Sequence, residues 1–129
     1  MNKSEYRKVF IATGWDHYTQ QQFVIIGKSS NSDAIKKFSP KQIETFHLSI
    51  RFSKNFFGEY AESFANDLID DIVNSLQWYY AIVPRCSLFE KYGFVYYMDI
   101  DNTKKLLEYW YSYLTNEEKQ QKREKRNNL

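Results

Sequence analysis

Side chains that could carry out nucleophilic, metal-binding or acid–base chemistry are scarce in this sequence. It holds two histidines, His17 and His47, and a single cysteine, Cys86. Neither histidine stands at H-x-x-x-H or H-x-H spacing and Cys86 has no C-x-x-C partner, so the spacing predicts no metal site. A lone cysteine without a spaced catalytic partner is more often inert than nucleophilic. Because glycine-rich phosphate loops and G-x-S-x-G elbows are also missing from the sequence, we predict that the protein is not an enzyme and uses no cofactor.

Aromatic residues, by contrast, are abundant: the 129 residues include 11 Tyr, 10 Phe and 3 Trp. Phenylalanine fills cores, whereas a buried tyrosine must find a partner for its hydroxyl, so surplus tyrosine tends to collect at interfaces. Four tyrosines that fall wholly or partly off the predicted apolar faces are candidate binding residues: Tyr79, Tyr96, Tyr109 and Tyr111. This composition predicts a binding protein.

The net charge of +2 hides separate basic and acidic blocks. Residues 55–84 carry five acidic and no basic side chains, whereas residues 1–54 and 119–129 are basic. Such blocks create faces of opposite sign that steer partners. The acidic candidates for a protein contact are Glu62, Asp67 and Asp70, and the basic candidates for a nucleic-acid contact are Lys8, Lys28, Arg51, Lys122 and Arg123.

The elements that would position these residues begin with strands. Residues 9–12 and 23–26 are short β-rich runs joined by a polar stretch, which predicts a hairpin or adjacent strands, and residues 27–37 read as a loop. Residues 43–53 alternate, with four apolar side chains on one side: Phe46, Leu48, Ile50 and Phe52. That period of two predicts a half-buried strand.

The strongest helix signal lies at residues 59–76. One apolar stripe runs over four turns and comprises Ala61, Phe64, Ala65, Leu68, Ile69, Ile72, Val73 and Leu76. Acidic and amide side chains occupy the other side. Burying eight apolar side chains at about 1.5–3 kcal/mol each would make this helix a principal core element.

Residues 78–83 and 94–100 are two aromatic strand candidates, and an amphipathic helix begins at residues 101–103. The predicted order is β-β-β-α-β-β-α. It describes one α+β domain over residues 1–118, with a mainly antiparallel sheet of about five strands and two helices packed on one face. Residues 119–129 are expected to form a polar, basic tail or a frayed helix.

Two function classes follow from the sequence. The first is a small accessory or inhibitory protein, encoded by a phage or mobile element, that docks on a larger protein or on a second copy as a homodimer; blocking a host defence system, as an anti-CRISPR does, is one form of it. The second is a single-stranded nucleic-acid-binding protein with a basic, aromatic sheet face. With one cysteine and no apolar run near eighteen residues, we expect no membrane association and a cytoplasmic location, in the host if the protein is viral.

Overall fold

The computed structural model describes residues 5–79 and 83–127, and its account of side chains covers residues 5–76 and 83–115. The elements in chain order are β1 (Tyr6–Asp16), β2 (Gln21–Ser29), the 3-10 helix η1 (Ala34–Lys37), α1 (Pro40–Phe46), β3 (Ser49–Phe57), α2 (Ala61–Tyr79), the 3-10 helix η2 (Glu90–Tyr92), β4 (Phe94–Tyr97) and α3 (Ile100–Asn127).

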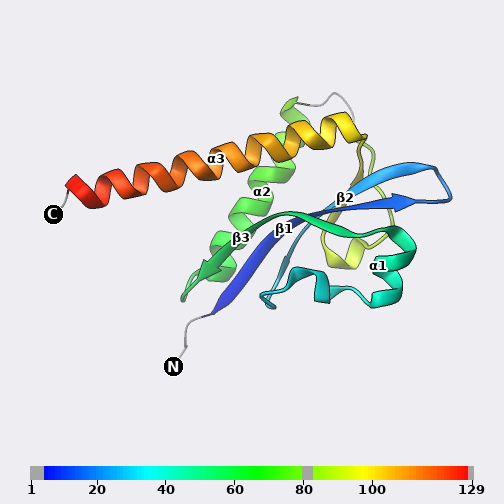
Figure 1. Cartoon of the computed structure of the whole chain (residues 1–129), viewed down its shortest axis with the longest axis horizontal. Helices are drawn as coiled ribbons and strands as arrows, with labels where there is room; N and C mark the ends of the chain where they lie inside the picture. Colours follow the sequence, from blue (N-terminus) through cyan, green and yellow to red (C-terminus); the bar gives the residue numbers. More distant parts are fainter. Residues whose placement is uncertain (1–4, 80–82, 128–129) are drawn as a thin grey trace.

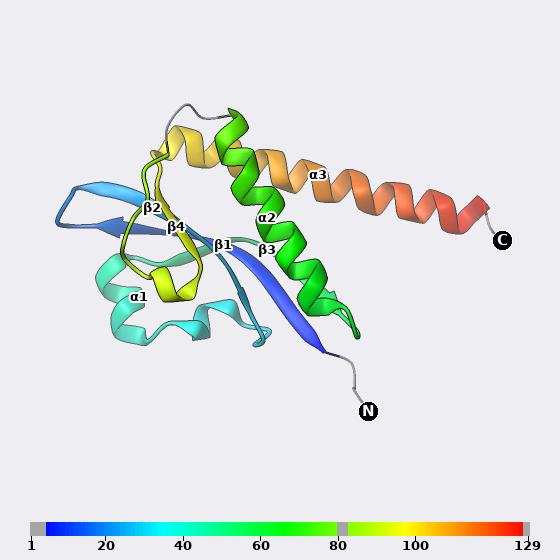
Figure 2. The same cartoon turned by 180° about the vertical axis from the view of Figure 1, so that it is seen from behind.

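The fold is α+β, as predicted, but the number of elements differs. The described residues form a four-stranded antiparallel sheet in the order β3-β1-β2-β4, with three α-helices instead of two. α2 and α3 cover one face of the sheet, whereas α1, η1 and η2 pack on the other (Figures 1 and 2). The two predicted helices, α2 and α3, therefore do lie on one face, and the third helix, α1, which was not predicted from the sequence, lies on the other.

The predicted hairpin of residues 9–12 and 23–26 is confirmed. β1 and β2 pair antiparallel, with Val9 opposite Lys28 and Asp16 opposite Gln21. Both strands are central, and their residues alternate between two hydrophobic cores. One core, which we call the helical core, holds Val9 and Ile11 under α2 and α3, and the other holds Phe10 and Ala12 under α1. Burial on both faces explains why these strands are continuously apolar.

The strand predicted over residues 43–53 is wrong in its first half, which belongs to α1. Ser39 caps this helix: its side chain accepts from the backbone N–H of Gln42, and the Gln42 side chain accepts from the Ser39 N–H, with Pro40 at the first helical position. This is a capping box with proline at N1, a helix-start signal that the sequence contains. The alternation of apolar residues over 43–53 favoured a strand prediction over this helix signal.

The second half of residues 43–53 belongs to β3, where a β-bulge in the β1–β3 ladder directs its apolar side chains into two different cores. Ile11 pairs with Phe52 and the next residue, Ala12, pairs with Ile50, so Arg51 is an extra residue. Phe52 consequently packs in the helical core, whereas Ile50 packs on the opposite side of the sheet. The expectation that both share one face is wrong, because a bulge breaks the period of two.

The helix predicted at residues 59–76 is confirmed as α2, which extends to Tyr79. Most of the predicted stripe is buried against the sheet, and Ile72 is fully enclosed. Phe64 is the exception, because it is 52% exposed. The strand predicted at 78–83 is wrong for its first two residues, which end α2, and residues 80–82 lie outside the described part of the chain.

β4 is shorter than predicted and α3 longer. β4 pairs with β2 along one edge, and on its other edge Cys86 donates its backbone N–H to the carbonyl of Val95. Cys86 is itself fully buried. α3 begins at Ile100, where the predicted strand was to end, and its C-terminal half projects away from the rest of the molecule (Figures 1 and 2).

Candidate functional site

A group of exposed and partly exposed aromatic side chains lies at the end of the sheet where β1 begins and β3 ends. We call this group the aromatic patch; it comprises Tyr6, Phe56, Phe57, Tyr60 and Phe64. Phe57 is 70% exposed, Tyr60 62% and Phe64 52%, whereas the other two are partly buried. Phenylalanine and tyrosine rings are the side chains that gain most when a contact removes them from water, so their exposure here makes the patch a candidate site.

The rings of the aromatic patch contact one another on both sides of the sheet end. Tyr6 and Phe57 have ring centroids 5.2 Å apart on the side of α1. On the side of α2, Phe64 lies 6.4 Å from Phe56 and 6.2 Å from Tyr60. The patch therefore wraps around the end of the sheet, with its most exposed rings on two flanks.

A tight connection between β3 and α2 positions the patch. Gly58 adopts a φ of +99°, a conformation that residues with a Cβ rarely adopt. Its N–H donates to the carbonyl of Glu5, and its own carbonyl accepts from the N–H of Ala61 at the start of α2. These bonds hold Phe57 and Tyr60, which flank the turn, close to the first turn of the helix.

The acidic residues beside the patch divide into paired and unpaired groups. Glu62 forms ion pairs with both Arg7 and Lys28, and the hydrogen bond from Lys28 is the main reason why the pKa of Glu62 is lowered. Asp67 and Asp70, in contrast, are exposed farther along α2. Of the three predicted acidic binding residues, Glu62 thus joins α2 to the sheet, and the other two present carboxylates to solvent.

The predicted tyrosine anchors lie elsewhere, and two of them on α3 already make internal contacts. Tyr111 donates its hydroxyl to the carbonyl of Arg51 at 2.5 Å and packs edge-on against Phe52. Tyr109 packs against Trp110 with the ring centroids 5.1 Å apart. Both tyrosines remain about half exposed.

The other two predicted tyrosines come from β4 and from the end of α2. Tyr96 is half-buried in β4, and the guanidinium of Arg85 lies 5.4 Å from its ring centroid. Tyr79 ends α2, and its side chain lies outside the described residues. None of these four tyrosines belongs to the aromatic patch, which sequence reasoning missed. The available signal was Phe57-Gly58-Glu59-Tyr60, two aromatic residues around a glycine turn.

Among the predicted basic residues, Lys8 and Lys28 lie on opposite faces of the sheet. Lys28 points toward α2, where it also donates to the side chain of Asn66. Lys8 points to the other side of the sheet and donates to the carbonyl of Ser32 at 2.5 Å. Arg51 is exposed at the bulge of the edge strand β3. Lys122 and Arg123 lie on α3, and their side chains are outside the described part.

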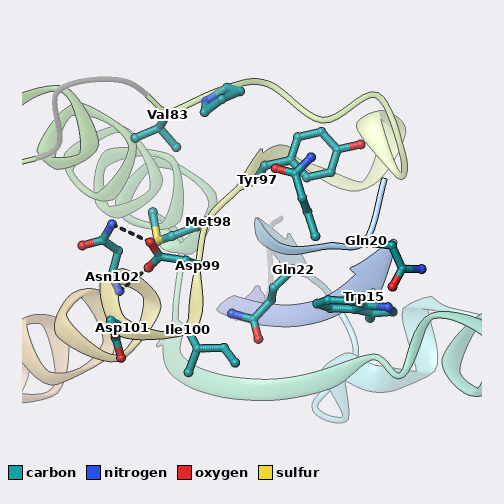
Figure 3. Close-up of a pocket in the computed structure, with 12 residues that line it drawn as sticks. Trp15, Gln20, Gln22, Val83, Tyr97, Met98, Asp99, Ile100, Asp101 and Asn102 are labelled. Atoms are coloured by element: carbon teal, nitrogen blue, oxygen red, sulfur yellow. Dashed lines mark hydrogen bonds between the residues drawn. The ribbon is translucent and has the colours of Figure 1, made fainter. Parts of the chain in front are cut away.

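A second feature is an open pocket of about 690 Å³ between the turn end of the β1–β2 hairpin and the start of α3 (Figure 3). Its lining includes the rings of Trp15 and Tyr97, the amide of Gln22 and the exposed Ile100. Gln22 donates its side-chain amide to the hydroxyl of Thr103, which joins the hairpin to α3. The lining residues include no histidine, cysteine, lysine or arginine, and their ionisable side chains are those of Tyr97, Asp99 and Asp101.

Tyr97, which lines the pocket, also contacts a buried carboxylate. Asp16 is buried and accepts a hydrogen bond from the Tyr97 hydroxyl at 2.7 Å and one from the backbone N–H of Tyr18 at 2.9 Å. The bond from Tyr97 lowers the pKa of Asp16, and the same bond raises the pKa of Tyr97 to about 12. Since both groups are satisfied within the fold, this pair stabilises the hairpin turn and β4 and does not supply a poised acid or base.

Within the described residues, no group of three or more His, Cys, Asp or Glu side chains converges to hold a metal ion. No described helix has the length and apolar content needed to cross a bilayer. The chain matches no protein-family model, no curated protein and no solved structure. The site must therefore be interpreted from its own geometry.

Proposed function

We propose that this chain is a small binding protein that docks on a larger protein through the aromatic patch. The observation that supports the proposal is the exposure of Phe57, Tyr60 and Phe64 beside the acidic surface of α2. Aromatic side chains provide large contact areas with few torsions to immobilise, and they dominate binding energy when a partner encloses them.

The charges around the patch define the chemistry of the partner. Residues 55–84 contain no lysine or arginine, and α2 exposes Asp67, Asp70 and Asp71. A complementary partner would offer apolar pockets for the rings and a basic rim for the carboxylates. A protein with a nucleic-acid-binding channel has such a surface, so an accessory or inhibitory role against such a protein, as in phage or mobile-element defence blocking, is the specific form that we propose.

Single-stranded nucleic acid fits the geometry less well. The contacts of Lys8 and Lys28 direct them to opposite sides of the sheet, and Lys28 is paired with Glu62. Phosphate contacts require unpaired basic groups along one surface. Beside the aromatic patch, Arg7 is paired with Glu62 and Nζ of Lys54 lies 5.9 Å from the Phe56 ring centroid, while the exposed carboxylates of α2 would repel phosphates.

Site-specific photo-crosslinking tests the proposal. A crosslinking amino acid at Tyr60 or Phe64 should capture one discrete protein in cells that express the chain, whereas the same group at Tyr18 should not. Tyr18 is the matched control because it is 92% exposed but lies in the β1–β2 turn at the other end of the sheet. With the captured partner purified, Tyr60→Ala or Phe64→Ala should weaken binding by roughly 2 kcal/mol or more if it is a hot spot.

Three results would contradict the proposal. Equal crosslinking from Tyr18 and Tyr60 would mean that the patch has no special role. Crosslinking only to a second copy of the chain would indicate a homodimer. Binding to generic single-stranded DNA or RNA, with a steep salt dependence and loss upon Arg51→Ala, would favour the nucleic-acid alternative.

A further inference from the structure

The only two histidines of the chain, thirty residues apart in sequence, meet in the fold. His17 lies in the turn between β1 and β2, and His47 is the residue that ends α1. Their ring centroids are 5.7 Å apart with the rings inclined at 65°. Both residues are exposed to solvent.

Local hydrogen bonds hold each histidine in place. Nε2 of His17 lies 2.9 Å from the carbonyl oxygen of Thr45 in α1. A carbonyl can only accept, so Nε2 carries the proton, and the neutral ring has its lone pair on Nδ1. The carbonyl of His17 also accepts from the Gln20 side chain at 2.7 Å, which fixes the turn.

The backbone of His47 is equally constrained. It adopts a left-handed conformation with a φ of 52°, and its N–H donates to the carbonyl of Ile43. The following N–H, of Leu48, donates to the same carbonyl at 3.0 Å. The imidazole therefore projects from a defined helix end and not from a mobile loop.

This arrangement matches one used by metal-binding histidines, in which one ring nitrogen donates to a backbone carbonyl and the other ligates the metal. A metal ion about 2.0–2.1 Å from one nitrogen of each ring places the two ring centroids roughly 5–6 Å apart. The observed separation of 5.7 Å falls in that interval. Imidazole is a ligand for zinc, copper and nickel, whereas magnesium and calcium prefer oxygen.

We propose that His17 and His47 together bind one divalent transition-metal ion of the zinc class, with Nδ1 of His17 as one ligand. Because no third His, Cys, Asp or Glu converges on the pair in the described part of the chain, solvent completes the coordination shell. The bound ion links the β1–β2 turn to the end of α1. This site is separate from the aromatic patch and does not depend on the proposed docking function.

Zinc titration of the untagged protein tests the site, because an affinity tag would add histidines. Isothermal titration calorimetry should give one Zn²⁺ per chain and no heat of binding with Mg²⁺. His17→Gln and His47→Asn should each weaken zinc binding at least tenfold. These replacements preserve the fold, since glutamine keeps a donor for the Thr45 carbonyl and asparagine tolerates the left-handed conformation. Gln21→Ala, at an exposed neighbouring position, should bind zinc as the parent does.

The ring-nitrogen NMR signals provide a second readout, because the protein has only two imidazoles. Both sets of signals should shift along the same zinc-binding curve, with the Nδ1 signal of His17 moving more than its Nε2 signal. The proposal is overturned if the two imidazoles respond at different zinc concentrations, if either variant binds as tightly as the parent, or if two chains share each ion. Absence of any binding at about 1 mM Zn²⁺ overturns it as well.

Discussion

Two residues of the same predicted apolar stripe should respond very differently to truncation. Ile72 and Phe64 both belong to the stripe of α2, but Ile72 is fully buried in the helical core and Phe64 is more than half exposed. Ile72→Ala removes three carbon atoms at about 0.8 kcal/mol per buried methylene, and the cavity that remains raises the expected loss of stability to about 2–5 kcal/mol. Phe64→Ala leaves no enclosed cavity, so we expect a loss of less than about 1 kcal/mol.

Urea unfolding followed by far-UV circular dichroism measures both losses. If the slopes of the transitions are equal, the shift of the midpoint reports the change in free energy of unfolding directly. The matched variant Leu68→Ala should resemble Ile72→Ala, because Leu68 is also buried against the sheet. A Phe64→Ala variant as unstable as Ile72→Ala would refute the assignment of Phe64 to a binding surface. It would show that this ring is part of the core.

Three further predictions concern charge and the end of the chain. Tyr97→Phe should lower the free energy of unfolding by about 1.5–3 kcal/mol, because the buried carboxylate of Asp16 loses its hydroxyl donor. The pKa of Asp16 is lowered in the folded state, so the difference in stability between variant and parent, measured by urea unfolding, should shrink as the pH falls through that pKa. Glu62→Gln should reduce the thermal midpoint at pH 7, and the reduction should shrink as the pH falls through the lowered pKa of Glu62, because its ion pairs contribute only while it is ionised; a reduction that does not change with pH would contradict an ionic role. Deleting Lys119–Leu129 should leave the thermal midpoint unchanged within about a degree, since the segment has no apolar side chain before Leu129; a large drop would reveal contacts that its composition does not suggest.

Periodicity and turn chemistry determined the parts of the fold that depend on local sequence. The apolar stripe from Ala61 to Leu76 specified α2, because a repeat of 3 and 4 residues can only form one face as a helix. The two apolar runs around residues 9–12 and 23–26 specified the central hairpin. The capping box at Ser39 was also local, and α1 could have been predicted from it.

Other features depended on which elements pack together. The bulge at Arg51 sends Ile50 and Phe52 into different cores, and no local pattern predicts it because it depends on the pairing of β3 with β1. Phe64 satisfies the helical period, yet its ring contacts the partly exposed ring of Phe56 and the exposed ring of Tyr60 and stays 52% exposed, so its exposure is a tertiary property.

The candidate sites show the same division between sequence and structure. The sequence alone determined that aromatic side chains are abundant, that residues 55–84 are acidic and that only two histidines are present. Only the tertiary structure decided that Phe57, Tyr60 and Phe64 form one exposed patch and that His17 meets His47. The physical reason is that sequence spacing limits contacts only within one element, whereas the contact between a hairpin turn and a helix end is set by how the sheet and α1 pack.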